Sequence, residues 1–357
     1  MTELDRSKTE AFAARMTSVL NSAALALMTS IGRQTGLFET MAGRPPSTSD
    51  DIARAAGLDE RYVREWLGAM VTGGIVEFDA AARTYVLPPE HAAVITNAAG
   101  ARNIARFTQY IPMLGEVEAD VIESFRHGGG VPYSRYPRFS ALMAESSGLR
   151  FDHLLLPAVV PLTGLGAALE RGIDVLDIGC GRGHAINLLG RAFPRSRFAG
   201  YDFSEEGIAA ARAEAQGLGL TNVRFAVRDV AALEEQAACD LVTAFDVIHD
   251  QARPDAVLLS VARALRPEGT FLMVDVRASS ELQDNVAHPF GPFLYGMSTM
   301  HCMTVSLALG GAGLGTAWGE QKALAMLGEA GFTRVEVQRL PDDPLNNYYL
   351  ARKAWSQ

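Results

Sequence analysis

Acidic residues stand at the ends of five apolar runs in the second half of the chain, and such a pattern is suited to binding a positively charged ligand. The runs and their acids are 173–178 with Asp177, 197–201 with Asp202, 223–227 with Asp229, 241–245 with Asp246 and 270–274 with Asp275. If the runs are parallel strands, their carboxyl ends meet at the edge where open α/β sheets bind ligands. Each aspartate alone is equally well explained as a helix N-cap, but five in succession favour a site.

A histidine and a further acid, His249 and Asp250, follow the fourth run. A neutral hydroxyl must lose its proton before it can attack an electrophile, and a histidine with a pKa near 7 is suited to remove it. The alternative is a loop histidine that only bonds to the backbone. The residues after the first run are also informative, because Gly179, Gly181 and Gly183 predict a tight turn that exposes backbone to a ligand. A dinucleotide fingerprint would instead need its third glycine at position 184, which is a histidine.

The G-x-G-x-G spacing resembles motif I of class I S-adenosylmethionine (SAM) methyltransferases. The resemblance implies SAM as cofactor and S-adenosyl-L-homocysteine as product, with Asp202 on the ribose, Asp229 at the adenine edge and the glycines beside the methionine portion. The implied cofactor-binding residues are Asp177, Gly179, Cys180, Gly181, Gly183, Asp202, Phe203, Asp229, Val230 and Asp246.

The segment from His249-Asp250 to 264–269 resembles the His-Asp step of plant-type and polyketide-type O-methyltransferases. This implies that His249 is the catalytic base, that Asp275 orients it, and that Asp250 belongs to the same catalytic group. Two features depart from that pattern: Gln251 replaces the usual aromatic residue, and Glu320 matches the family's second acid only approximately. The family also leaves the acceptor atom open among oxygen, nitrogen, sulfur and carbon.

The spacing of apolar residues predicts the helices and strands that position these residues. A helix is predicted over 254–265 and ends at the 266–269 turn, and another is predicted over 321–330. Strands over 332–338 and 346–351 are separated only by the short 341–344 turn, so they must pair antiparallel. The predicted fold class is α/β, a seven-stranded Rossmann-like methyltransferase sheet with a mostly α-helical winged-helix domain before it.

The winged helix is predicted between residues 47 and 87. Residues 47–50 cap a helix that stops at Gly57, Asp59 caps a second helix, and strands over 75–78 and 84–87 form the wing. The face expected to be buried comprises Tyr62, Val63, Trp66, Leu67, Met70 and Val71. DNA binding would need surplus cations on the second helix, but Glu60, Arg61, Arg64 and Glu65 balance one another. The alternative is a dimerisation and substrate-lid module, as in the small-molecule O-methyltransferases that the chain resembles.

A long helix over 11–41 has a broad apolar face, which predicts a partner subunit and hence a homodimer. The loop at 128–137 is either a linker or a substrate flap carrying Tyr133. Residues 277–319 are too long for a simple connection and are predicted to form a lid. Its candidate acceptor contacts are Tyr295, Ser298, His301 and Cys302. The predicted domains are 1–95 (winged helix), 96–160 (helical connector and flap) and 161–357 (SAM domain).

Composition sets broader limits. The 357 residues carry a net charge of −9, which argues against a large nucleic-acid interface. The apolar stretch 153–169 is interrupted by proline and glycine, so no membrane span is expected. Three cysteines without paired spacing predict reduced thiols and a cytoplasmic location. The spacing of His288, His301 and Cys302 matches no zinc site, so no metal is expected. The predicted function is SAM-dependent methylation of a small molecule, with a ligand-responsive transcription regulator without turnover as the alternative.

Overall fold

The computed structural model describes residues 4–353, and the chain divides into two compact units, 1–113 and 114–357. The predicted domains were 1–95, 96–160 and 161–357. Their boundaries differ from those of the two compact units, and this division stays a prediction.

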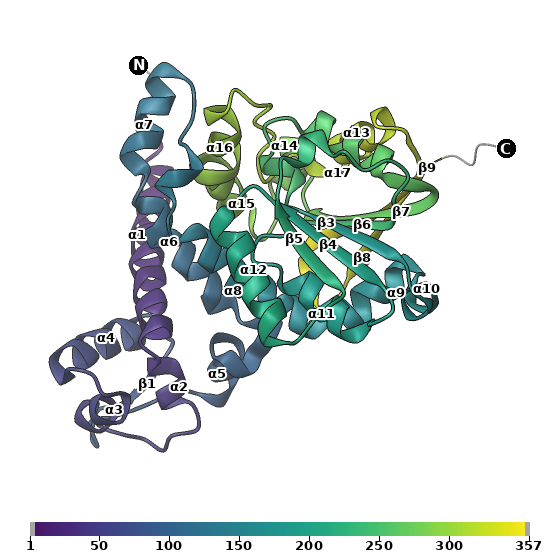
Figure 1. Ribbon diagram of the computed structural model, residues 1–357. Helices are drawn as coiled ribbons and strands as arrows, with labels where there is room; N and C mark the ends of the chain where they lie inside the picture. The colour runs from purple at the N-terminus through teal and green to yellow at the C-terminus, as the bar shows by residue number, and fades with distance from the viewer. Residues whose placement is uncertain (1–3, 354–357) are drawn as a thin grey trace. The chain divides into compact units, whose positions relative to one another are not determined.

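The first unit is a winged helix preceded by a long helix (Figure 1). Its elements are α1 (Arg6–Gln34), α2 (Leu37–Met41), α3 (Ser49–Ala56), α4 (Glu60–Thr72), β1 (Glu77–Asp79), β2 (Thr84–Val86), α5 (Pro89–Ile95), η1 (Asn97–Arg102) and η2 (Ile104–Gln109). The side chains of Thr48 and Asp59 cap α3 and α4. Gly57 ends α3 in the left-handed conformation, at φ 67°. The predicted wing is confirmed, with Glu77 paired to Val86.

Two expectations for this unit are corrected. The predicted helix over 11–41 begins earlier, at Arg6, and breaks into α1 and α2 at Gly36, whose φ is 72°. A right-handed helix does not accommodate such a φ. Tyr62 was expected on the buried face of α4 but is 80% exposed, since Val63, Trp66, Leu67 and Met70 fill the core side.

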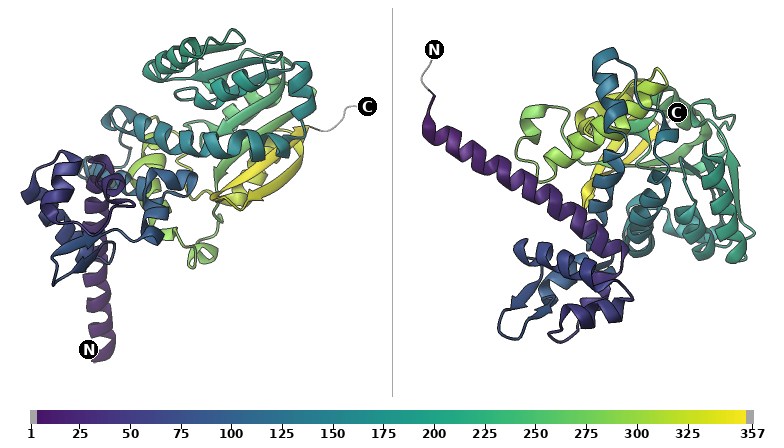
Figure 2. Two further views of the ribbon diagram at one scale, coloured as in Figure 1. Left: turned by 90° about the horizontal axis from the view of Figure 1, so that it is seen from below. Right: turned by 90° about the vertical axis from the view of Figure 1, so that its left-hand side faces the viewer.

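Most of α1 extends away from the winged-helix core of its own unit (Figure 2, right). Phe12, Met16, Val19 and Leu20 are exposed along it. Among the described helices, α1 is the one that is long and apolar enough to cross a membrane by length and composition alone. Length and composition alone do not test the expectation that no segment spans a membrane, which stays a prediction.

The second unit is an α/β domain built on a seven-stranded sheet. The segment α6 (Tyr110–Gly115) contains the boundary between the units. The next elements are α7 (Glu118–His127), η3 (Tyr133–Arg135), α8 (Phe139–Arg150), the π-helix η4 (Phe151–Val159), α9 (Val160–Thr163), α10 (Gly166–Arg171), β3 (Asp174–Ile178), α11 (His184–Ala192), β4 (Arg197–Asp202), α12 (Glu205–Gly217), β5 (Val223–Val227) and η5 (Val230–Ala232). They are followed by β6 (Cys239–Phe245), η6 (Ile248–Asp250), α13 (Pro254–Ala264), β7 (Leu265–Val276), α14 (Leu282–Asn285), α15 (Gly291–Met297), the π-helix η7 (Ser298–Cys302), α16 (Met303–Ala308), α17 (Gly319–Glu329), β8 (Phe332–Leu340) and β9 (Asp343–Lys353).

The strand order is β5-β4-β3-β6-β7-β9-β8, and β9 runs antiparallel to both of its neighbours, β7 and β8. The predicted sheet and its terminal hairpin are therefore confirmed. One boundary differs: β7 starts at Leu265 rather than Thr270, because residues 266–269 continue the strand instead of forming a separate turn. The order in which strands are added reverses at β3: β4 and β5 lie on one side of it, and β6 and β7 lie on the other. Ligands bind at such a switch point.

Helices cover both faces of the sheet, as the two views of Figure 2 show. On one face, α13 and α17 bury Val257, Val261 and Leu327 against β6 and β7. On the other, η4, α11 and α12 bury Leu155, Ile186 and Ile208. The apolar stretch 153–169, which proline and glycine interrupt, contributes to this second core.

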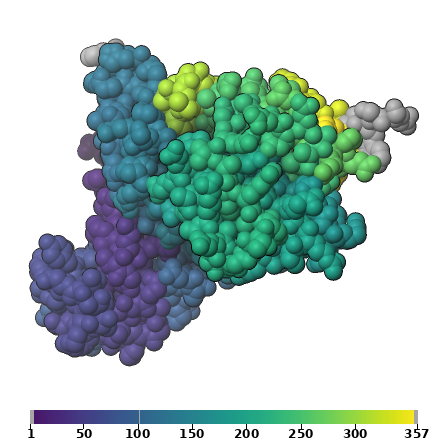
Figure 3. All heavy atoms as spheres, in the orientation of Figure 1, coloured from purple at the N-terminus to yellow at the C-terminus, as the bar shows by residue number. Residues whose placement is uncertain are grey.

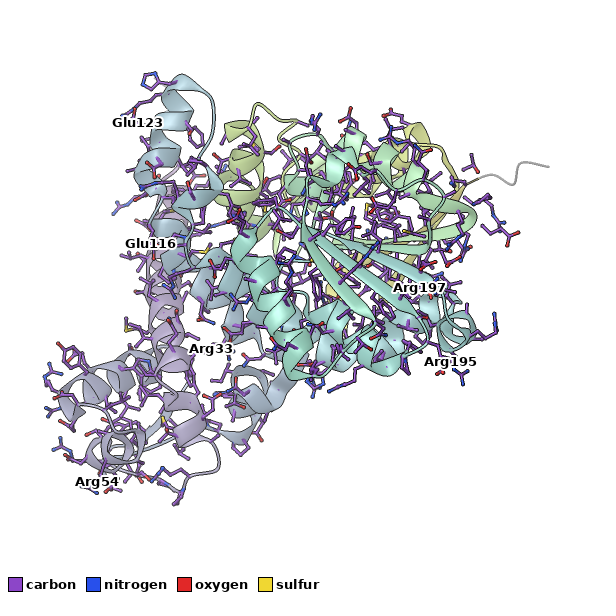
Figure 4. The ribbon with its side chains drawn as sticks, in the orientation of Figure 1. Arg33, Arg54, Glu116, Glu123, Arg195 and Arg197 are labelled. Carbon is purple, nitrogen blue, oxygen red and sulfur yellow. The ribbon has the colours of Figure 1, made fainter. Side chains whose placement is uncertain are left out.

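The amino ends of the strands are joined by ion pairs (Arg197 is labelled in Figure 4). Arg197 contacts Asp174 at 2.7 Å, and Arg266 contacts Asp174 and Asp240 at 2.9 and 2.6 Å. Hydrogen bonds from Arg197 lower the pKa of Asp174. These contacts tie the amino ends of β3, β4, β6 and β7 together.

Candidate active site

The glycine turn after β3 brings bare backbone to the carboxyl edge of the sheet. Gly179, Gly181 and Gly183 all have positive φ, at 62°, 53° and 76°. A Cβ on Gly183 would lie 2.5 Å from that of Ala211, and one on Gly179 would lie 2.6 Å from Val247. These two positions therefore need glycine for packing. A Cβ on Gly181 would meet nothing within 4 Å, so Gly181 faces open space at the site.

Two buried carboxylates hold this turn. Oδ2 of Asp202, at the end of β4, accepts a hydrogen bond from the Gly181 N–H at 2.8 Å, and its Oδ1 accepts one from Ser204. Asp177 lies within β3 and accepts a 2.6 Å hydrogen bond from the Thr243 hydroxyl. Burial raises the pKa of both carboxyls, that of Asp177 to about 7. Because burial disfavours the charged form of both carboxyls, a positively charged neighbour would stabilise their carboxylates.

A buried ion pair supports the next acid along the sheet. Asp246 follows β6 with a positive φ of 57°, and its carboxylate contacts the guanidinium of Arg150 at 2.7 Å. Arg150, at the end of α8, also lies 3.9 Å from Asp343 in β9. This arginine was not predicted as a site residue, because its partner lies 96 positions along the chain. An arginine at the edge of a strongly apolar stretch was the only available signal.

His249 and Asp275 meet as the family resemblance implies. Nδ1 of His249, in η6, lies 2.7 Å from Oδ1 of Asp275, near the end of β7. Burial by itself would lower the pKa of His249, but the charge of Asp275 and the neighbouring Cys302 raise it well above its ordinary value. Asp250, in the same turn, has a pKa raised to about 6 by burial. Glu320 instead accepts hydrogen bonds from Arg339 and Asn347.

A cavity of about 520 Å³ opens at this edge. It is within the size range of small-molecule sites. Every residue predicted to contact the cofactor lines it, namely Asp177, Gly179, Cys180, Gly181, Gly183, Asp202, Phe203, Asp229, Val230 and Asp246. Asp250 and Tyr133 line it too, whereas His249 is 5% exposed and its imidazole lies behind the wall.

The predicted acceptor contacts in the 277–319 segment are placed differently. Tyr295, Ser298, His301 and Cys302 do not belong to the cavity wall among the described residues. Tyr295 accepts a hydrogen bond from Asn285 at 3.0 Å, while Ser298, His301 and Cys302 are buried within the unit. The reason is that the π-helical turn of η7 directs these side chains into the packing between helices. The segment reaches the cavity through Val305 and Leu309 instead.

Apolar residues of α8 and of the start of η4 form part of the wall that the sequence did not reveal. Phe139, Met143 and Phe151 line the cavity together with Phe245 and Val305. The loop before α8 rests on α16, since Val131 N–H donates to the Thr304 hydroxyl at 2.9 Å. α7 contacts η7, the turn before α16, and Figure 3 shows the surface of this region. Periodicity predicted helices here, but it does not say which face meets a cavity.

Across residues 4–353, no group of three or more His, Cys, Asp or Glu side chains is arranged to hold a metal ion. The three cysteines, Cys180, Cys239 and Cys302, are free thiols.

Comparison with known proteins identifies the parts of the chain. Residues 23–97 match the Rv2258c-like winged HTH domain, and residues 169–327 match a methyltransferase domain. This chain joins a winged helix-turn-helix domain to a methyltransferase domain. The predicted enzyme class and fold class agree with these matches.

Curated relatives match over part of their length. A fatty-acid O-methyltransferase of Mycolicibacterium smegmatis is 32% identical over 113 residues, which is 32% of this chain and 40% of the relative. A tRNA (guanine-N(7)-)-methyltransferase of Rhodopseudomonas palustris is 31% identical over 130 residues, 33% of this chain and 52% of the relative. The chain thus spans about half, or less, of the length of these relatives.

Solved structures share the fold over nearly the whole chain. Mitomycin 7-O-methyltransferase MmcR has a TM-score of 0.67 at 18% identity, with 98% of this chain and 100% of that chain covered. Human N-acetylserotonin methyltransferase, solved in complex with SAM, has a TM-score of 0.66 at 15% identity, with 99% of each chain covered. At such low identity, the likeness establishes the fold.

Proposed function

We propose that this protein is a SAM-dependent methyltransferase that methylates an oxygen atom of a small molecule. The observation that carries the proposal is the gathering of all the predicted cofactor-binding residues in one cavity beside the His249–Asp275 pair. The fatty-acid O-methyltransferase relative supports oxygen as the acceptor atom, and the SAM-bound human structure supports the cofactor.

The cavity fits SAM on two grounds. The open backbone at Gly181 leaves room where a side chain would otherwise project, and the carboxyls of Asp177 and Asp202 complement positive charge. When bound, SAM supplies an electrophilic methyl group, and S-adenosyl-L-homocysteine remains as product. In the proposal, Asp202 accepts hydrogen bonds from the ribose hydroxyls, and Asp229 lies at the adenine edge.

His249 removes the acceptor's proton in this proposal. Its Nδ1 is held by Asp275, so Nε2 is the atom that accepts the proton, and Asp275 stabilises the imidazolium that results. The imidazole lies just behind the cavity wall, and catalytic hydrogen bonds often tighten only once substrate is bound. A group that is already ionised, such as a carboxylate, needs no base.

Turnover of labelled SAM tests the proposal. The full-length protein is incubated with phenols, aliphatic alcohols, fatty acids, thiols and tRNA, and products are identified by mass spectrometry. We expect label on the oxygen of a small molecule and none on tRNA. Label on tRNA alone, or no transfer to any acceptor in the presence of cell extract, would overturn the proposal.

We also propose that the protein is a homodimer, with the exposed apolar face of α1 covered by a second copy. Phe12, Val19 and Leu20 are 64%, 51% and 70% exposed. Several large apolar side chains exposed along one helix are typical of a surface that binds a partner.

Light scattering on wild type and on the Val19→Glu/Leu20→Glu double variant tests the proposed homodimer. We expect a dimer that the double variant converts to a monomer. A wild-type monomer, or wild type that partitions onto phospholipid vesicles through α1, would contradict it.

The winged HTH match keeps the regulator as a second candidate, but the charges on α4 give it little support. Arg61 pairs with Glu65 and Arg64 pairs with Glu60, so the exposed side of this helix has no surplus of cations. Binding of duplex DNA by the full-length protein, at micromolar concentration or below and dependent on salt, would favour the regulator.

We propose a cytoplasmic location, which the free thiols of the described cysteines support.

A further inference from the structure

His184 lies between two carboxylates at the wall of the cavity. Its Nε2 is 2.9 Å from Oδ1 of Asp152, and its Nδ1 is 2.6 Å from Oε1 of Glu214. An ionised carboxylate only accepts hydrogen bonds, so both ring nitrogens must donate. An imidazole that donates from both nitrogens is protonated. The geometry is therefore that of an imidazolium between two carboxylates.

These contacts join three segments of the second unit. His184 is the first residue of α11 and directly follows the glycine turn, Asp152 belongs to η4, and Glu214 belongs to α12. Figure 1 shows α8, α11 and α12 close together, and α11 contacts α8, η4 and α12. The glycine turn and the α8–η4 segment (residues 139–159) form two walls of the same cavity. One side chain thus ties one wall to the other.

A second cation holds the α8–η4 segment but does not titrate near neutral pH. Arg150, the last residue of α8, pairs with Asp246 after β6, and an arginine stays protonated in proteins. Of the two cations, His184 is the one that can lose its charge near neutral pH. The segment also contains the π-helix η4, and π-helical turns occur frequently at functional sites.

The charge of His184 depends on the two carboxylates that face it. Asp152 faces the ring from η4, and Glu214 faces it from α12. α8 approaches the ring with Gly148, which has no side chain, and α11 contributes the neutral Asn187, whose amide donates to Oε2 of Glu214 at 2.8 Å. Burial by itself would lower the pKa of His184, but the hydrogen bonds with Asp152 and Glu214 raise it above its ordinary value.

We propose that protonated His184 is a positioning residue that holds the α8–η4 segment against the glycine turn, and that this contact slows the release of S-adenosyl-L-homocysteine at acidic pH. A neutral imidazole has a single donor, so loss of the proton leaves at most one of the two hydrogen bonds. The product then leaves faster. This inference rests on the proposed function, because it concerns the same cavity.

The direction and the size of the effect follow from the charge and the exposure. A contact that needs the protonated form is complete below the unfolded pKa of the histidine and is lost as pH rises through its raised folded pKa. The side chains of His184, Asp152 and Glu214 are 31%, 51% and 33% exposed. Ion pairs at such partly exposed positions are weak, so we expect a change of about two- to fivefold in the dissociation rate.

The test measures the dissociation rate of S-adenosyl-L-homocysteine from the full-length protein between pH 6 and pH 9. His184→Gln should release the product about two- to fivefold faster than wild type at pH 6 and at an equal rate at pH 9. The comparison is made at each pH because Asp177 also titrates in this range, and its contribution is common to both proteins. The ratio of the two rates should change with a midpoint above 6.5.

Two further variants separate this role from a structural one. Asp152→Asn removes one of the two carboxylates that hold the proton, so it should move the midpoint to lower pH. His127→Gln is the control, because His127 is an exposed histidine of α7 that pairs with Glu123. It should match wild type at every pH.

Three results would overturn the inference. The first is release from His184→Gln at the wild-type rate at pH 6. The second is release that is faster by the same factor at pH 6 and pH 9, which would make His184 a structural residue. The third is an unchanged midpoint in Asp152→Asn. Failure of S-adenosyl-L-homocysteine to bind wild type at any pH would instead sink the proposed function, and this inference with it.

Discussion

Nδ1 of His249 lies 2.7 Å from Oδ1 of Asp275, and both side chains are buried at the carboxyl edge of neighbouring strands. The second oxygen of Asp275 has no hydrogen-bond partner among the described residues. The pair is therefore held by one strong contact. Burial lowers the pKa of His249, and the Asp275 carboxylate is the largest of the influences that raise it.

Replacement of His249 by alanine should separate catalysis from cofactor binding. His249→Ala should lower the rate on a neutral aliphatic hydroxyl by about 10²- to 10⁴-fold, the range for losing a general base. SAM affinity, measured by calorimetry, should stay near that of wild type, because the imidazole lies outside the cavity wall. An acceptor ionised at neutral pH should keep most of its rate. Full activity on the neutral hydroxyl would make His249 structural.

The pH profile should follow the raised pKa of His249. Only the deprotonated imidazole accepts a proton, so the rate on an aliphatic alcohol should rise with pH, with a midpoint above 6.5. Stability has the opposite sign: the contribution of His249 is complete below its unfolded pKa and is lost as pH rises through the folded pKa. Asp275→Asn removes the main cause of the shift and should move the midpoint to lower pH. An unchanged midpoint in that variant would contradict the pairing.

SAM binding should weaken in acid through Asp177. Its pKa of about 7 means that the carboxyl is mostly neutral at pH 6, when it no longer complements a cation. The Kd for SAM should rise by up to about tenfold between pH 8 and pH 6, the change expected for one titrating group. S-adenosyl-L-homocysteine, which lacks the sulfonium charge, should show a smaller change. Asp177→Asn should flatten the profile, and an equally steep profile in this variant would exclude Asp177 as the cause.

Breaking the Arg150–Asp246 pair should destabilise the protein. Arg150→Met leaves the buried carboxylate of Asp246 without its cation. Such a loss typically costs about 3 to 5 kcal/mol. Arg150→Met/Asp246→Asn removes the stranded charge and should recover part of that stability. Chemical unfolding of both variants measures the difference. Equal stability of Arg150→Met and wild type would show that the pair contributes little.

The sequence predicted the parallel part of the sheet well because strands β3 to β7 contain apolar runs that are followed by acids or glycines. The cofactor side of the cavity followed for the same reason, since residues at the ends of neighbouring parallel strands must lie together. The acceptor side was harder to predict. It is formed by one face of α8, by Phe151 of the π-helix η4 and by Val305 of α16, and neither a π-helical turn nor the buried face of an amphipathic helix can be recognised from composition.

Long-range pairing accounts for the other omissions. Arg150 reaches Asp246 and Asp343 from a different element, and no local pattern marks such a contact. The break of the first helix at Gly36 was hidden by apolar periodicity on both sides of the glycine. Tyr62 shares the helical spacing of its buried neighbours but lies one position outside the core-facing stripe.

Titration calorimetry of the full-length protein with SAM tests the central claim most directly. We predict one SAM site per chain, and an Asp202→Ala variant that binds about 1.5 to 3 kcal/mol more weakly, the range for a hydrogen bond to a charged group. Asp284→Ala, at an exposed acid in α14, should match wild type. Binding of NADH without binding of SAM would contradict the account, and unchanged SAM affinity in Asp202→Ala would remove that residue from the site.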